Sequence, residues 1–281
     1  MKQINFAHLS DTHLNHDGKE GFLRNNTTDN LRMAFDRLQG LPQKMDFVVI
    51  TGDVAHEGDE EDYRFVRELL DEYKQKLGVP ILVTLGNHDN RQAFYKGYLG
   101  IESDEPYKKS ADIGGLRVIV LDSKVGAHDV GGTIGEDQLT WLKEELKTPA
   151  EHGTVIAFHH PPDHTVLPVG EHCLTNGGEL LSAIEGTDVI GILTGHTHFS
   201  NQGVYGGGIL NSTAGSTAFG LLMSPDAMRM VDTCAFNLCC VIDKKLLVSS
   251  YQCEDADELA AFTSIPKEFD PEDYKAKEKI S

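Results

Sequence analysis

The sequence predicts an α/β fold, with parallel strands alternating with helices up to about residue 200. Short apolar runs of strand length are separated by stretches with apolar residues at three- and four-residue intervals, the period of a helix. Each apolar run is soon followed by a polar motif, as at the carboxyl ends of buried strands. Beyond residue 200, glycine-rich turns and apolar runs with little helix between them predict strands joined by hairpins.

Five strands and three helices are expected in the first part of the chain. The strands are predicted at residues 4–7, 47–50, 81–83, 155–158 and 189–193, and the helices at residues 29–38, 60–77 and 136–146. The helix at 60–77 has the clearest apolar stripe, and Gly78 is placed to end it. Residues 206–208, 211–212 and 230–251 predict the turns and strands of the second part.

Five polar motifs follow the predicted strands in chain order. They are Asp11-Thr12-His13, Gly52-Asp53, Gly86-Asn87-His88-Asp89, His159-His160 and Gly195-His196-Thr197-His198. Each motif alone is weak, since a Gly-Asp pair is an ordinary turn dipeptide. Together they offer the oxygen and imidazole ligands that suit Zn, Mn and Fe. About eight such groups are too many for one tetrahedral ion, but they fit two metal ions that share a ligand.

In their order and residue pattern, these motifs resemble those of the calcineurin-like metallophosphoesterase superfamily. Its pattern of D-x-H, G-D, G-N-H-[D/E], H and G-H-x-H is matched in all five blocks, over roughly residues 4–200. Three further segments resemble the bacterial class III cyclic-nucleotide phosphodiesterase branch, which also contains glycerophosphodiesterases: Leu121-Asp122-Ser123, Gly131-Gly132 and His159-His160-Pro161-Pro162. The resemblance implies a four-layer α/β/β/α sandwich of two mixed sheets flanked by helices.

The resemblance also implies two sets of metal ligands that share one carboxylate. The sets are Asp11, His13 and His198 for one ion and Asn87, His159 and His196 for the other, with Asp53 bridging. The bridge needs a carboxylate, because its oxygens can satisfy two cations roughly 3.5–4 Å apart. Asn87 is a neutral ligand, so the ion that it binds is expected to be the more labile. Of the two adjacent histidines, His159 is chosen because it lies closer to the strand end than His160.

His88 is expected to face the open side of the metal pair, because its neighbour Asn87 is a predicted ligand. There it could bind a phosphoryl oxygen or protonate the leaving alkoxide. Asp89 either orients the His88 imidazole or caps the following helical turn. His56 and His164 each follow a predicted ligand by a few residues and are candidates for substrate contact, with Asn87 and His88. No motif for a covalent phosphoenzyme is evident, so direct attack by a metal-bridging hydroxide is favoured.

The remaining histidines are predicted to lie outside the site. His8 is expected in the core, within the first strand. The others are expected at the surface: His16, His128, His152 and His172.

The predicted function is hydrolysis of small phosphodiesters by a dinuclear metal enzyme. Cyclic nucleotides such as cAMP are the first candidate substrates and glycerophosphodiesters the second. An alternative function is that of a phosphomonoesterase with the same fold. A second alternative is a non-catalytic scaffold for protein binding, like the retromer subunit with this fold. Scaffold members typically lose a ligand or the histidine after the metal-bound asparagine, whereas Asn87 and His88 are both present. Specificity is expected in the loops at 15–26 and 164–176.

Composition favours a cytoplasmic protein. The 25 basic and 44 acidic residues give a net charge of −19, which makes long nucleic acid a poor partner. A small anionic substrate stays possible, because two divalent ions would leave the site locally positive. No signal peptide pattern opens the sequence, and no apolar stretch is long enough to cross a membrane. The five cysteines lack metal-binding spacing and are expected to be reduced.

Two regions are expected. Residues 1–253 are predicted to form the catalytic domain, and residues 254–281 a polar tail. The tail is either disordered or an arm that supports a homo-oligomer, because a few apolar positions in it need cover. Its truncation would then change the oligomeric state more than the chemistry.

Overall fold

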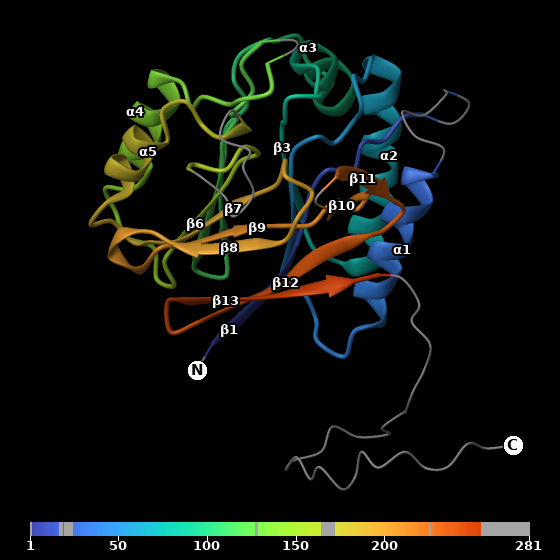
Figure 1. Cartoon of the computed structure of the whole chain (residues 1–281). Coiled ribbons are helices and arrows are strands. Elements are labelled where there is room, and N and C mark those ends of the chain that lie inside the picture. The colour runs from blue at the N-terminus through green and yellow to red at the C-terminus, as the bar shows by residue number, and fades with distance from the viewer. Residues whose placement is uncertain are drawn as a thin grey trace, which may run out of the picture.

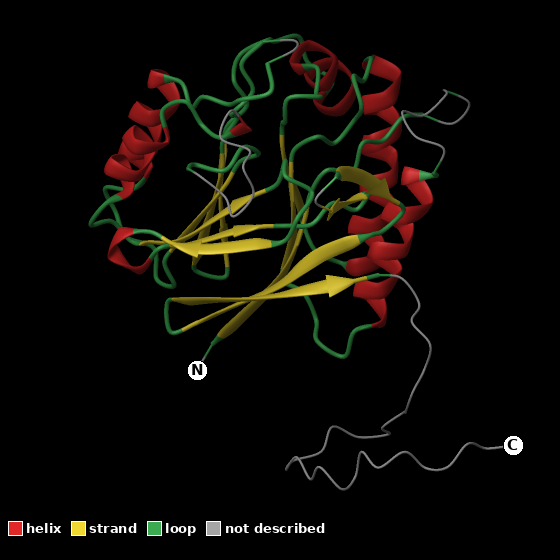
Figure 2. Ribbon diagram, in the orientation of Figure 1, coloured by secondary structure: helices red, strands yellow, loops and turns green. Residues whose placement is uncertain are grey.

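Two mixed β-sheets stack face to face and carry helices on their outer faces. This arrangement is seen in a computed structural model that describes residues 2–16, 19, 25–126, 129–163, 172–224 and 226–253. In Figure 1, α1 and α2 lie on one side of the molecule and α4 and α5 on the other, with both large sheets between them. Figure 2 shows the same layers by type of element. The predicted four-layer α/β/β/α sandwich is therefore confirmed.

The first sheet has five strands in the order β13-β12-β1-β2-β3. Its members are β1 (Gln3–Leu9), β2 (Phe47–Thr51), β3 (Ile81–Thr84), β12 (Ala235–Ile242) and β13 (Lys245–Gln252). The first three run parallel, whereas β12 and β13 form an antiparallel hairpin that adds to the edge of β1. The helices on its outer face are α1 (Thr27–Gly40) and α2 (Glu60–Leu77).

The second sheet has six strands in the order β4-β5-β6-β7-β9-β8. Its members are β4 (Lys109–Ile113), β5 (Leu116–Val120), β6 (Thr154–Ala157), β7 (Val189–Thr194), β8 (Asn201–Val204) and β9 (Leu210–Thr213). The four central strands are parallel, and the two edge strands, β4 and β8, are antiparallel to their neighbours. The helices on its outer face are α4 (Glu136–Glu145) and α5 (Gly177–Ile184).

Five smaller elements are also present in the described ranges. They are α3 (Arg91–Phe94), a π-helical turn (Tyr95–Leu99), a 3-10 turn (Gly206–Gly208) and an antiparallel hairpin of β10 (Gly220–Ser224) and β11 (Ala227–Val231). No helix in the described ranges is both long and apolar enough to cross a bilayer.

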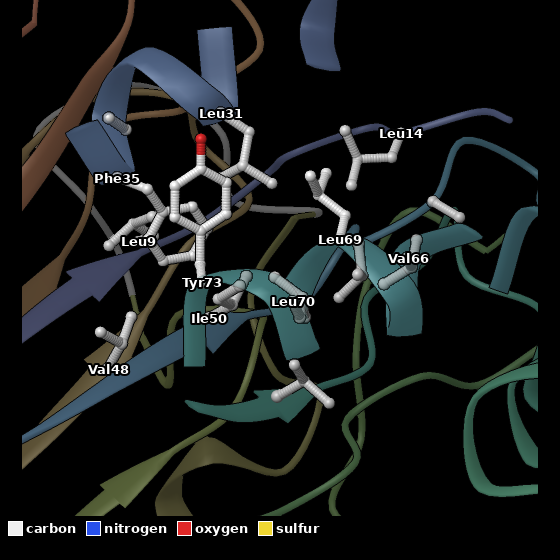
Figure 3. Packing of buried hydrophobic residues seen from close by; sticks show 14 of the residues in the cluster. Leu9, Leu14, Leu31, Phe35, Val48, Ile50, Val66, Leu69, Leu70 and Tyr73 are labelled. Atoms are coloured by element: carbon white, nitrogen blue, oxygen red, sulfur yellow. The ribbon is translucent and has the colours of Figure 1, made fainter. Parts of the chain in front are cut away.

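The parallel strands are buried on both faces because their side chains alternate between two apolar layers. In β1, Phe6 points to the layer between the sheets, and Ala7 points to the helices. Phe6 stacks on Phe47 of β2 with ring centroids 4.4 Å apart. Figure 3 shows the helix-side layer, where Phe35 of α1 and Tyr73 of α2 pack over the sheet. A third apolar cluster lies under α4 and α5.

The predicted elements are present, and the elements that were not predicted were missed for local reasons. The helix predicted at 60–77 ends at Gly78, which has a φ of 71° and donates its N–H to the carbonyl of Lys74. β4 was not predicted because it is a polar, half-exposed edge strand. β5 was not predicted either, although it is apolar, because none of the five polar motifs follows it. α5 was missed because it has only eight residues and begins with two glycines. The hairpin of β4 and β5 also interrupts the expected series of parallel units.

The C-terminal segment 254–281 lies outside the described residues. The boundary at residue 253 and the role of the tail in assembly therefore stay predictions.

The layer between the sheets should contribute a large part of the stability. Replacing Phe6, which is fully buried, with alanine should lower the free energy of unfolding by about 3–5 kcal/mol. Leu247→Ala on β13 is the control, because its side chain is 55% exposed and its loss should change stability by less than about 0.5 kcal/mol. Urea denaturation of both variants measures the difference. Equal stabilities would contradict this assignment of the inter-sheet core.

Candidate metal centre

The five polar motifs meet at one edge of the stacked sheets. Asp11 follows the end of β1 by two residues, and Asp53 follows β2 at the same distance. His159 and His196 stand in the same relation to β6 and β7 in the other sheet. Because parallel strands end at the same edge, these side chains converge between the two sheets.

One group of side chains forms around the first motif. The Nε2 atom of His13 lies 3.4 Å from Nε2 of His198 and 3.7 Å from Oδ2 of Asp53. Nε2 of His198 lies 3.3 Å from Oδ1 of Asp11. We call Asp11, His13, His198 and Asp53 the first cluster.

A second group forms around His159. Its Nε2 atom lies 3.1 Å from Oδ1 of Asn87, 3.2 Å from Nδ1 of His196 and 3.3 Å from Oδ2 of Asp53. We call Asn87, His159, His196 and Asp53 the second cluster. The structure therefore brings all seven predicted ligands together, with the Asp53 carboxylate between the two clusters.

The ring nitrogens that face away from the clusters are also held. Nδ1 of His159 donates to the carbonyl of Thr51 at 2.7 Å, and Nδ1 of His198 donates to that of Phe219 at 2.9 Å. The two other imidazoles contact further histidines: Nδ1 of His13 lies 3.1 Å from Nδ1 of His56, and Nε2 of His196 lies 3.2 Å from Nδ1 of His172. Such outer contacts fix the ring orientation of metal-binding histidines in general.

The backbone of the motifs adopts an unfavourable conformation. Five residues of the clusters have positive φ angles: Asp11 (53°), His13 (43°), Asp53 (47°), His196 (71°) and His198 (57°). Left-handed conformations of non-glycine residues cost about 1–3 kcal/mol each and concentrate at functional sites. The reversal lets the chain turn sharply after each strand, so that these side chains lie against those of the neighbouring strands.

Two glycines of the motifs are required by close packing. A Cβ atom on Gly86 would lie 2.3 Å from Oδ1 of Asp53. One on Gly195 would lie 1.8 Å from Oγ of Ser10 and 2.7 Å from Oδ2 of Asp11. Any larger residue at either position would therefore displace a carboxylate of the site.

The buried carboxylates and imidazoles strongly shift one another's pKa values. Burial raises the pKa of Asp53, but the facing His159 and then His13 outweigh this and hold the pKa well below its ordinary value. Burial also lowers the pKa of His159, yet the Asp53 carboxylate raises it to about 9. His198 follows the same pattern, because Asp11 overcomes the effect of burial and raises its pKa.

The residues present fit a pair of transition-metal ions. Oδ1 of Asp11 is buried and accepts no hydrogen bond from the described residues, although it lies within 3.3 Å of Nε2 of His198. An uncompensated buried carboxylate oxygen is costly unless a cation binds it. Carboxylate, amide and imidazole groups are the donors that Zn, Mn and Fe prefer.

His88 lies beside the first cluster and is half-buried. Its backbone N–H donates to Oδ1 of Asp53 at 2.8 Å. Its ring stacks on that of His56 with centroids 4.7 Å apart and meets that of His13 edge-on at 5.2 Å. The His56 ring also lies 5.2 Å from that of His13, so the rings of His13, His56 and His88 are mutual neighbours. His164, the other histidine predicted to contact substrate, lies outside the described residues.

Asp89 departs from both predicted roles. Its carboxylate accepts hydrogen bonds from the backbone N–H groups of Val54 (3.1 Å), Ala55 (3.0 Å) and Gly86 (2.8 Å) and from the Tyr63 hydroxyl (2.7 Å). These donors, rather than the His88 imidazole, occupy its two oxygens. The residue that caps α3 is Asn90, whose side chain accepts from the N–H of Ala93. Asp89 instead ties the loop after β3 to the loop after β2.

Two histidines predicted at the surface are half-buried, because each contacts a group of the interior. His172 contacts His196 of the second cluster, and His16 contacts the buried carboxylate of Asp62 through both its N–H and its ring. One signal in the sequence points to His172, because this residue falls in the loop at 164–176, which is expected to carry specificity. His8 is buried in β1 as predicted, with Nε2 at 2.9 Å from the Thr51 hydroxyl. His128 lies outside the described residues.

Comparison with known proteins identifies the class. The model of the calcineurin-like phosphoesterase family matches residues 4–200, so the chain belongs to this family. Members of the family use a dinuclear metal centre, and the two clusters supply candidate ligands for one. The chain is thus a phosphoester hydrolase, and the predicted resemblance is confirmed.

Individual proteins similar to this chain include two phosphodiesterases and a phosphatase of known structure. A cAMP/cGMP dual specificity phosphodiesterase of Mycobacterium tuberculosis is 37% identical over 214 residues, which cover 75% of this chain and 67% of that protein. A glycerophosphodiester phosphodiesterase of Enterobacter lignolyticus is 30% identical over 206 residues, covering 68% of this chain and 70% of the relative. A dimetal phosphatase of Danio rerio shares the fold with a TM-score of 0.56 at 16% identity, covering 87% of this chain and 98% of the other.

The contacts of Asp89 predict a structural role that can be separated from catalysis. Asp89→Ala should lower the free energy of unfolding by at least about 3 kcal/mol, because each buried donor that it leaves unpaired costs about 1–3 kcal/mol. Tyr63→Phe removes one of the four donors and also the acceptor of the Asn90 N–H, so it should cost less than Asp89→Ala, about 2 kcal/mol. Urea denaturation of the metal-free proteins measures both changes. An Asp89→Ala protein with wild-type stability and no activity would instead favour the predicted orienting role toward His88.

Proposed function

We propose that this chain hydrolyses small phosphodiesters with two transition-metal ions, Mn, Fe or Zn, held by the first and second clusters. The observation that carries the proposal is the position of Asp53. Its Oδ2 atom lies 3.7 Å from His13 of one cluster and 3.3 Å from His159 of the other. A carboxylate so placed can serve two cations roughly 3.5–4 Å apart, as in two-metal phosphoesterases.

Two bound ions would supply an activated water and charge stabilisation for an in-line displacement at phosphorus. The residues of the chain would hold the two ions in place and donate a proton to the leaving group. His88 is suited to this second task, because its half-buried ring lies next to the clusters without belonging to either. Protonation of a leaving alkoxide by a positioned side chain typically accelerates hydrolysis about 10²–10⁴-fold.

The proposed substrates are cyclic nucleotides first and glycerophosphodiesters second. The printed activities of the relatives from Mycobacterium tuberculosis and Enterobacter lignolyticus support these two classes. Both are small anions with an alkoxide leaving group, which a general acid would assist. The net charge of −19 argues against long nucleic acid as a substrate. A cytoplasmic location stays a prediction from the sequence.

The bridging position of Asp53 predicts the metal content of a variant. The wild-type protein should carry about two transition-metal ions per chain, and Asp53→Ala should weaken both sites together because it removes the shared ligand. His198→Ala is the matched comparison, since it removes a ligand of the first cluster alone. Elemental analysis after equilibrium dialysis gives the occupancies. Full occupancy in Asp53→Ala would show that the bridge is misassigned.

The role of His88 predicts a dependence on the leaving group. His88→Ala should retain its metals and lose about 10²–10⁴-fold in turnover of a cyclic nucleotide or glycerol diester, because their alkoxides need a proton. An activated aryl ester, such as a bis-nitrophenyl phosphate, should lose much less. The control is His152→Ala, whose imidazole lies beside Glu151, away from the clusters. Equal losses on both ester types would refute the general-acid role.

A further inference from the structure

Lys124 reaches the loop that carries Asn87. Its ammonium donates to the backbone carbonyl of Asn87 at 2.6 Å and to that of Gly126 at 3.1 Å. The side chain is half-buried and comes from the loop that follows β5. Asn87 follows β3 in the other sheet, so the contact links the two sheets beside the second cluster.

The backbone N–H and the backbone carbonyl of Lys124 are both hydrogen-bonded. Its N–H donates to Oδ1 of Asp122 at 2.8 Å, and its carbonyl accepts from Nη2 of Arg91 at 2.9 Å. Nε of Arg91 in turn donates to Oδ2 of Asp122, also at 2.8 Å. Arg91 begins α3 and lies four residues after Asn87. The contacts therefore close a ring that runs from Asn87 through Arg91, Asp122 and Lys124 back to Asn87.

The rest of this loop is held by different partners. Asp89 accepts from the N–H of Gly86, the N–H of His88 donates to Asp53, and the N–H of Glu57 donates to the carbonyl of His88. Lys124 thus adds an anchor at Asn87, between two positions already fixed. The anchor matters because an amide oxygen is a weaker metal ligand than an imidazole nitrogen or a carboxylate. Among the oxygen and nitrogen donors of the second cluster, Asn87 depends most on being held in position.

We propose that Lys124 is a positioning residue for the second metal site, which it completes by holding the Asn87 peptide so that Oδ1 faces Nε2 of His159. This inference rests on the proposed two-metal function. It assigns Lys124 an effect on one ion and not on the other, because the ligands of the first cluster are held by contacts that do not involve it.

Two effects of Lys124 on a bound cation have opposite signs. The hydrogen bond to Asn87 orients a ligand and favours binding, whereas a positive charge nearby repels a cation. The direction of the change on substitution therefore separates a positioning role from a merely electrostatic one. Loss of an outer contact to a metal ligand typically weakens metal affinity about 10–100-fold.

The test is titration of the full metal-free chain with Mn²⁺, followed by equilibrium dialysis and calorimetry. The second site is expected to be the weaker, because its ligand Asn87 is neutral. In Lys124→Met the Kd of this weaker site should rise about 10–100-fold, while that of the tighter first site should change by less than about twofold. Lys124→Arg should recover most of the affinity, since it keeps both the charge and the donors. Lys96→Met is the control, because that lysine pairs with Glu102 at the surface. Lys124→Gln, which keeps a donor without charge, should fall between Met and Arg and serves if the Met variant does not fold.

Three outcomes would overturn the inference. An unchanged weaker site in Lys124→Met would remove the positioning role, and together with a raised KM it would make Lys124 a substrate contact. Tighter binding in Lys124→Met and Lys124→Gln would show that repulsion dominates. Weakening of both sites alike would indicate a general loss of structure. A wild-type chain that binds fewer than two Mn²⁺ ions would instead overturn the proposed two-metal function, on which the inference rests.

Discussion

The Asp53 carboxylate, placed between two stacked sheets, is the contact on which the rest of the site depends. One of its oxygens accepts the N–H of His88, and the other faces both His13 and His159. It reaches this position because the chain after β2 turns back in a left-handed conformation and because Gly86 leaves room beside it. The loops of both sheets are thereby organised around a single carboxylate group.

Holding this arrangement requires a stable frame. Five left-handed residues in the clusters cost on the order of 5 kcal/mol in total, even at the low end of about 1 kcal/mol each. That cost is comparable to the entire net stability of an ordinary domain, about 5–15 kcal/mol. The three apolar layers and the hydrogen bonds that Asp89 accepts offset this conformational cost. They also fix the strand ends from which the ligands project. The two clusters are also anchored alike: each has one imidazole tied to a backbone carbonyl and one that contacts a further histidine.

The sequence predicted what is encoded locally and failed where contacts join distant segments. Strands, the helix at 60–77 and the polar motifs after the strands follow from short patterns. The family resemblance then implied which seven residues are ligands, and the structure brings them together. The role of Asp89 could not be read in this way, because its partners include Val54 and Tyr63 from other elements. His172 and Lys124 carry no periodic signal, and their contacts cross 24 and 37 positions of the chain. The edge strand β4 was missed because it is polar, and the helix α5 because it is short and begins with two glycines. The apolar strand β5 was missed because none of the five polar motifs follows it.

A dinuclear centre bridged by Asp53 is best tested with an anomalous-scattering map from crystals of the protein grown with Mn²⁺. We expect two peaks roughly 3.5–4 Å apart, one within each cluster, with the Asp53 carboxylate in contact with both. A single peak, or two peaks that do not share Asp53, would contradict the dinuclear centre.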